Sequence, residues 1–422
     1  MTQMQFRPIP GSHKYVFTAA PHHGESFGSL CVLDLRVPND NHMSQIRRIT
    51  PFEAFPESET YGRSQYRYGA PWPLSEDLFL CNSWEDLVML DRYGNEELLC
   101  ERELLPIGYD PRLRLSEPIP LRPRPTPPVV AQQTAQGEDF EDLDRTATIG
   151  VVNVNIHDRP FPKDRPIKRL RVLQVIPKSN PWMDRPFVGY ATENTPRIPL
   201  GTVPVEEDGS AYFEAPYGKQ LIFQALDENN MAVQTMRAVA FVHPGEKLVC
   251  VGCHEPTTES VPNADDSAQP LAFQRPASKL EPECGPIEPI NYYRLIKPTA
   301  EKSCIPCHLE KNVDLKSMEH EDLRPYVYYY SGSMLGGLTT TGSHGGSRSR
   351  PGRVGASESK LGSILFDENH RESVSDEDRR KFILWLDANA LRLGAFQDEE
   401  AQKRGELVWP LLDVEPCREY SP

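Results

Sequence analysis

Residues 201–213 read GTVPVEEDGSAYF and contain two short apolar runs separated by Asp208-Gly209. Glycine accepts the positive φ that a tight hairpin turn demands, so this stretch predicts two strands joined by a turn. Other apolar runs of strand length surround it, and we expect strands at residues 149–156, 167–176, 203–205, 211–213, 220–226 and 233–242. The sequence therefore predicts a β-sandwich as the middle domain, over residues 147–258.

The composition indicates a mainly β protein with more than one domain. The chain has 422 residues, of which 41 are proline, and helices tolerate proline poorly. Its net charge of −15 repels phosphate backbones, so nucleic acid is not an expected partner. No run of eighteen apolar residues is present, so we expect no membrane span.

The N-terminal part repeats one short pattern. Residues 30–34 (LCVLD) and 87–91 (LVMLD) lie 57 residues apart, and each ends a predicted strand pair, the first opened by residues 15–20 and the second by residues 78–81. This offset is near the period of about 50 residues found in kelch-type propeller blades. Two blades cannot close a ring, so we expect residues 1–110 to form an incomplete propeller-like β domain.

Two stretches without a regular apolar period divide the chain. Seven prolines fall within residues 111–128, and a polar stretch follows them. We therefore expect a linker over residues 111–146 that is first extended and then flexible. A second linker is expected over residues 259–290.

Two copies of one five-residue pattern carry the chemistry. Residues 250–254 (CVGCH) and 304–308 (CIPCH) are both C-x-x-C-H, the attachment sequence of a c-type haem, and this composition gives only about 0.005 copies by chance. The two thiols of each copy match the two haem vinyl groups, and the following histidine is placed to bind the iron. The sequence predicts two covalently bound haem c groups, attached through Cys250, Cys253, Cys304 and Cys307, with His254 and His308 as iron ligands.

Two other interpretations of the cysteine pairs stay open. Two C-x-x-C pairs can supply four thiolates to one structural zinc ion, and a single pair can act as redox-active thiols. Zinc ribbons separate their pairs by about 15–20 residues, whereas 50 residues lie between Cys253 and Cys304. Zinc also leaves the histidine after both pairs unexplained, so haem is favoured.

The C-terminal part has a helical period. Residues 375–378 (SDED) open a run in which Phe382, Ile383 and Leu386 recur at helical spacing, and Gly394 is expected to end it. A haem motif, a long loop and an amphipathic terminal helix are the parts of a small cytochrome c-like helical domain, predicted over residues 291–400 and followed by a tail over 401–422.

The second haem needs a distal iron ligand, and His370, just before the terminal helix, is our choice. The other candidates are less suited. Met334 and His344 lie in a glycine- and serine-rich loop, and His320 is expected to be a solvated surface residue because its neighbours are acidic. For the first haem, Met236 and His243 are candidates for a sixth ligand, although each is expected to be packed in or at the end of a strand.

Several stretches together carry a family resemblance. They are GTVPVEEDGSAYF at 201–213, QALD at 224–227, QTMR at 234–237, PGE at 244–246 before the first haem motif, and WLDAN at 385–389. Over about residues 147–395 the chain resembles the middle and C-terminal regions of the hydrazine synthase alpha subunit family. HHGE at 22–25 and WPLSED at 72–77 are similar to the end of its N-terminal propeller.

The resemblance implies a catalytic haem at the first motif and an electron-transfer haem at the second. In the synthase itself, a tyrosine shortly after the first motif ligates the catalytic iron. Here residues 255–260 read EPTTES, and the next tyrosine is Tyr292. Because no tyrosine closely follows the first motif, the resemblance does not extend to hydrazine synthesis.

These observations predict a dihaem c-type cytochrome protein that acts in electron transfer or in an unidentified small-molecule redox reaction. The alternative is a non-catalytic binding or scaffold protein whose motifs hold structural haem or zinc. Expected partners are a redox protein or a small-molecule substrate, with further subunits. Covalent haem attachment takes place outside the cytoplasm, so an extracytoplasmic (periplasmic) location is expected. Residues 1–8 lack an export signal, so we expect a mature segment or the C-terminal part of a longer precursor.

Overall fold

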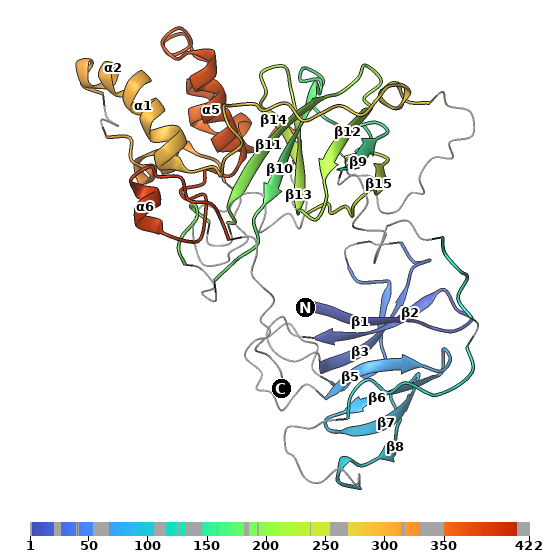
Figure 1. Ribbon diagram of the computed structural model, residues 1–422. Coiled ribbons are helices and arrows are strands. Elements are labelled where there is room, and N and C mark those ends of the chain that lie inside the picture. Colours follow the sequence, from blue (N-terminus) through green and yellow to red (C-terminus); the bar gives the residue numbers. More distant parts are fainter. Residues whose placement is uncertain are drawn as a thin grey trace. The chain divides into compact units, whose positions relative to one another are not determined.

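The computed structural model describes residues 2–20, 27–38, 40, 42–53, 67–104, 115–124, 126–131, 146–157, 159–180, 185–191, 194–236, 238–253, 269–313, 317–329 and 350–411. The chain divides into two units, residues 1–129 and 130–422. Within the described residues the fold consists of three open β-sheets and short helices (Figure 1). The prediction of a mainly β chain with a small helical part is confirmed. None of the helices described is long and apolar enough to cross a membrane.

The first unit is one antiparallel sheet. Its strands are β1 (Thr2–Pro8), β2 (Lys14–Ala20), β3 (Phe27–Asp34), β4 (Ile46–Arg48), β5 (Tyr68–Pro73), β6 (Leu78–Ser83), β7 (Asp86–Asp91) and β8 (Glu96–Cys100). The order is β1-β2-β3-β5-β6-β7-β8, with β4 beside β3. The two strand pairs expected from the repeated pattern are present as β2 with β3 and β6 with β7. A short 3₁₀ turn, η2 (Arg102–Leu104), follows β8.

Two further sheets share one apolar core in the second unit. One contains β11 (Arg197–Pro204), β10 (Arg169–Val175), β13 (Leu221–Leu226) and β14 (Ala232–Thr235) in that order, and the other contains β12 (Ala211–Pro216), β9 (Thr146–Val151) and β15 (Lys247–Cys250). The rings of Phe213 and Phe223 meet edge to face between the two sheets, 5.7 Å apart. Both sheets contribute to the buried cluster around Ile149 and Val172.

The predicted hairpin at residues 201–213 is wrong in its pairing. The turn exists, since the Glu206 N–H donates to the Ser210 carbonyl at 2.8 Å and Gly209 has φ +84°. However, β11 pairs with β10 and β12 pairs with β9, so the turn carries the chain from one sheet to the other. Turn chemistry is local, whereas strand pairing depends on which distant strands share the core.

The four-stranded sheet is buried on both faces because its side chains alternate between two cores. Along β10, Leu170 and Val172 enter the core between the sheets, while Leu173 joins a second cluster formed with the helices. Figure 1 shows these helices beside the four-stranded sheet. They are η5 (Tyr292–Ile296), α1 (Lys297–Ser303), α2 (Ile305–Glu310), η6 (His320–Tyr326), α3 (Gly355–Glu358), α4 (Lys360–Ile364), α5 (Asp376–Asp387) and α6 (Glu399–Lys403). The short η4 (Leu271–Gln274) instead lies against β12 of the three-stranded sheet.

Helix α5 begins where the acidic residues predict. The Ser375 hydroxyl accepts the backbone N–H of Asp378 at 3.1 Å and caps the helix. The helix ends at Asp387, well before Gly394, so the expected end is wrong. Asn389 and Ala390 take positive φ values of 72° and 52°, and the buried Trp385 indole donates to the Leu391 carbonyl at 2.7 Å. Packing of this non-helical segment ends the helix earlier than glycine would.

Candidate functional site

The second C-x-x-C-H motif lies on a short helix. Cys304 is the N-terminal flanking residue of α2, and the backbone N–H of His308 donates to its carbonyl at 3.1 Å. Residues three and four apart share one side of a helix, so Cys304, Cys307 and His308 project to the same side. Cys304 packs against the helical cluster, and this burial raises the pKa of its thiol to about 11.

The structure brings His370 to this motif from the segment between α4 and α5. The rings of His308 and His370 lie 6.3 Å apart between centroids, with an interplanar angle of 63°. Both side chains are partly exposed. Two imidazoles from distant parts of the chain thus lie close together at the second motif, near enough for both rings to bind one metal ion.

Asp367 orients the His370 ring, and the sequence analysis did not identify it. The Nδ1–H of His370 donates to Oδ1 of Asp367 at 2.7 Å. The same oxygen accepts the backbone N–H groups of Asn369 and His370, each at 2.9 Å. The hydrogen bond from His370 is the largest cause of the lowered pKa of Asp367. This contact leaves Nε2 of His370 as the nitrogen with a lone pair for a metal, and the D-x-x-H spacing in a turn was the available sequence signal.

The first C-x-x-C-H motif begins at the end of a strand. Cys250 is the last residue of β15 and pairs in parallel with Val151 on β9. The backbone N–H of Cys253 donates to the Ile156 carbonyl at 3.0 Å. Gly252 fits against the same segment, since a Cβ added there would lie 2.3 Å from the Ile156 oxygen. The backbone at this motif is therefore fixed by β9 and the turn that follows it, while His254 lies outside the described residues.

The candidate sixth ligands of the first motif have other contacts or lie at the surface. The Met236 sulfur accepts the Phe223 N–H at 3.3 Å and the side chain packs against both cores. His243 is exposed, and its ring meets Phe241 edge to face at 5.3 Å. For the second motif, the loop candidates Met334 and His344 lie outside the described residues.

The expectation that His320 is a surface residue is wrong. Its side chain is 2% exposed, its ring stacks on Tyr190 at 4.1 Å, and Nε2 lies 3.0 Å from the Ala390 carbonyl oxygen. Its acidic neighbours Glu319 and Asp322 form a capping box at the start of η6. The two acidic side chains cap the start of η6 at the surface, while the side chain of His320 points into the core. The acidic neighbours therefore did not indicate that His320 is exposed.

The two cysteine pairs do not form one cluster. In the part of the chain that the structure describes, which includes all four motif cysteines, no three histidine, cysteine, aspartate or glutamate side chains gather as a metal site would require. A single zinc ion held by both pairs therefore finds no support in the arrangement of these cysteines.

A buried ionic network, which the sequence analysis also missed, joins the four-stranded sheet to α5. Arg171 on β10 is fully buried. Its guanidinium binds Glu283 through two contacts of 2.6 Å and Asp387, on α5, at 2.8 Å. Burial lowers the pKa of Arg171, but the two carboxylates outweigh burial and the net pKa is raised. An arginine at the centre of an apolar strand and an aspartate on an apolar helix were the sequence signals.

The fold and the motifs define a class of protein, a β-rich chain that carries two C-x-x-C-H motifs, with a histidine pair at the second. Residues 166–255 match the family model described as hydrazine synthase alpha subunit middle domain. Residues 166–255 therefore form a domain of the hydrazine synthase alpha-like type, which confirms the resemblance seen in the sequence.

A solved structure agrees with this assignment at the level of the fold. The chain is similar to a chain of Kuenenia stuttgartiensis hydrazine synthase, with a TM-score of 0.61 and 16% sequence identity. The similarity covers 92% of this chain and 61% of the synthase chain, so the present chain spans about three fifths of the length of that relative. No curated protein matches the chain.

Proposed function

We propose that this chain is a dihaem c-type cytochrome protein that acts in electron transfer or in a small-molecule redox reaction. The observation that carries the proposal is the pairing of His308, the last residue of the second motif, with His370. C-x-x-C-H supplies the covalent attachment, and the second histidine supplies a distal ligand.

The ring separation supports iron between the two imidazoles. Metal–imidazole bonds are about 2.0–2.1 Å long and a ring nitrogen lies about 1.1 Å from the ring centre, so two opposed imidazoles on one metal have centroids about 6.2–6.4 Å apart. The rings of His308 and His370 are separated by 6.3 Å. The carboxylate of Asp367 on Nδ1 of His370 is the outer contact that metal-bound histidines usually make.

The protein around the second motif keeps these ligands in place. The Ser303 hydroxyl donates to Asp378 on α5 at 3.0 Å, which ties the residue before the motif to that helix. Asp378 is also the helix residue capped by Ser375. On the other side, the Arg379 guanidinium of α5 donates to the carbonyl of Arg371, the residue after His370, at 2.5 Å. The helix α5 thus contacts both the motif and the histidine turn, which supports the proposed cytochrome c-like character of this region.

When bound, haem supplies a reversible one-electron change at iron. Cys304 and Cys307 would hold the haem covalently, while His308 and His370 would both bind its iron and so keep a substrate from it. The second site is thereby suited to electron transfer. At the first site, Cys250, Cys253 and His254 would hold the other haem, and a small-molecule reaction would take place there.

We also propose a fold for the first unit, a cellular location and a set of partners. The antiparallel meander of the first unit, in which the pairs β2–β3 and β6–β7 carry the repeated sequence pattern, supports a propeller-like interpretation of this domain. We propose an extracytoplasmic location, because covalent haem attachment takes place there, and a redox protein, a small molecule or further subunits as partners.

The test is expression of the chain in a host with haem c maturation. Haem staining of denaturing gels should label the intact band, and only the combined loss of both cysteine pairs should remove the stain. His370→Ala should convert part of the low-spin spectrum to a high-spin one, whereas His42→Ala, at an exposed histidine of the first unit, should leave it unchanged. Absence of haem stain in the parent protein would refute the proposal. An unchanged spectrum in His370→Ala would refute the assignment of His370 as a ligand.

A further inference from the structure

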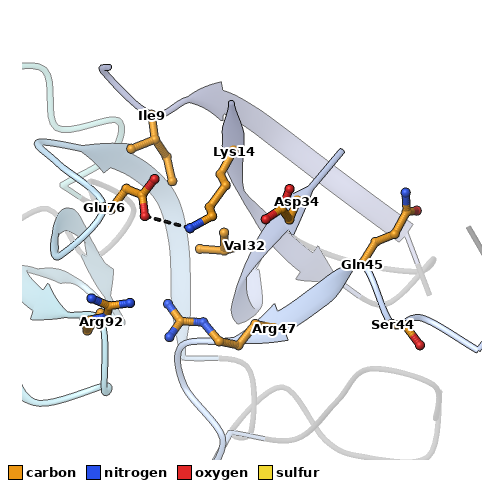
Figure 2. Close-up of a pocket in the computed structure, with 9 residues that line it drawn as sticks. All are labelled: Ile9, Lys14, Val32, Asp34, Ser44, Gln45, Arg47, Glu76 and Arg92. Atoms are coloured by element: carbon orange, nitrogen blue, oxygen red, sulfur yellow. Dashed lines mark hydrogen bonds and ion pairs between the residues drawn. The ribbon is translucent and has the colours of Figure 1, made fainter. Parts of the chain in front are cut away.

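The first unit contains a cavity that the haem proposal does not use. Its volume is about 260 Å³ and its lining comes from β2, β3, β4 and the loops that flank β6 and β7 (Figure 2). Ile9 and Val32, both almost fully buried, form an apolar wall. Lys14, Arg47 and Arg92 line the cavity with their cationic side chains. The carboxylates of Asp34 and Glu76 also line the cavity, so three cationic side chains face two carboxylates, and Asp34 is already paired with His13 at 2.9 Å.

The carboxylates nearby do not satisfy all of these cations. Lys14 pairs with Glu76 at 2.7 Å, as the dashed line in Figure 2 shows. Arg92 binds the exposed Asp77 through Nη1 at 2.8 Å, but its Nε is buried and has no hydrogen-bond partner among the described residues. No carboxylate of the described ranges pairs with Arg47.

We infer that this cavity binds a small oxyanion between Arg47 and Arg92. Figure 2 shows both guanidinium groups directed into the same space from β4 and from the end of β7. A guanidinium presents two parallel N–H donors that match the oxygens of a carboxylate or a phosphate. The buried Nε of Arg92 would gain the partner that it lacks, and the apolar wall lowers the local dielectric constant, which strengthens the attraction.

The cavity volume of about 260 Å³ lies just below the range of about 300–1,000 Å³ that is typical of pockets for drug-sized ligands, so the cavity has room for a small ligand. Carboxylate, phosphate and sulfate share the chemistry that the two guanidinium groups recognise. This site lies in the first unit and needs neither haem nor the motif residues, so its existence is independent of the proposed electron-transfer function.

Isothermal titration calorimetry of the full chain tests the inference, with acetate, phosphate and sulfate as separate titrants in Tris chloride at constant ionic strength. We expect saturable binding of at least one of them, and the arm that binds identifies a carboxylate or a tetrahedral oxyanion. Arg47→Gln should weaken binding by about tenfold or more, because a charge-assisted bidentate contact is lost. Arg47→Lys keeps the charge but loses the fork and should retain part of the affinity.

Arg122→Gln provides the matched control, since it removes an exposed arginine of the same unit that does not line the cavity. Far-UV circular dichroism checks that each variant is folded. Absence of binding by all three anions, or an equal loss in Arg47→Gln and Arg122→Gln, would overturn the inference. Haem content plays no part in the readout, so failure here leaves the proposed function intact.

Discussion

Replacing Arg171 by Met should destabilise the second unit strongly, because it leaves two buried carboxylates without their cation. The side chains of Glu283 and Asp387 are 5% and 0% exposed. Removing one partner of a buried ion pair costs about 3–5 kcal/mol, a large part of the 5–15 kcal/mol that typically separates folded from unfolded protein. With about 2–4 °C of Tm for each kcal/mol, we expect the Tm to fall by about 6–20 °C.

The effect should depend on pH in a direction that identifies its cause. Burial raises the pKa of Asp387, and Arg171 opposes this rise. Without Arg171 the folded-state pKa of Asp387 rises further above its unfolded value. A carboxyl group whose pKa is higher in the folded than in the unfolded protein stabilises the fold when the pH is below its pKa in the unfolded protein. This stabilisation is lost as the pH rises through its pKa in the folded protein. The difference in stability between parent and variant should therefore shrink as the pH is lowered.

Differential scanning calorimetry of the full chain provides the assay. Arg404→Met is the control, because Arg404 and its partner Glu406 are 61% and 56% exposed, and exposed pairs contribute little. Adding Glu283→Gln and Asp387→Asn to Arg171→Met should recover part of the lost Tm, since the uncompensated charges are then gone. A Tm for Arg171→Met that equals the control would refute the reasoning.

Three further predictions concern the motif sites. Asp367→Asn removes the carboxylate that orients His370, so binding of the His370 side chain to the haem iron should weaken by about 10–100-fold in the haem-loaded protein. The weaker binding should appear as a new high-spin fraction in the absorption spectrum, and an unchanged low-spin spectrum would contradict the prediction. In the chain without haem, a pKa of about 11 should make Cys304 react with iodoacetamide at pH 8 about two hundredfold more slowly than a free thiol, as measured by mass spectrometry, and equal rates would count against burial of the thiol. Gly252→Ala places a Cβ against the Ile156 carbonyl and should cost about 1–3 kcal/mol of stability in chemical denaturation, whereas Lys247→Ala, at an exposed residue of the preceding strand β15, should cost little.

The sequence by itself determined what depends on near neighbours in the chain. The C-x-x-C-H motifs are complete within five consecutive residues, so their chemistry could be recognised without a fold. The strands β9, β10, β12, β13 and β14 overlap the predicted apolar runs, and the start of α5 at Ser375 follows from capping, whereas β15 and most of β11 were not predicted. The turn at Asp208-Gly209 was predicted for the same reason, because positive φ is a property of the residue itself.

Only the tertiary structure decided which distant residues meet. It turned His320 into the core and buried Arg171 between Glu283 and Asp387. It also set the separation of 6.3 Å between the rings of His308 and His370, which the sequence had only suggested as a pair. It also sent β11 and β12 to different sheets. These contacts join residues far apart in the chain, and they form only when two apolar surfaces pack together and close the intervening loops. A local pattern specifies an apolar face or a reactive group, but the partner of that face or group is chosen by packing.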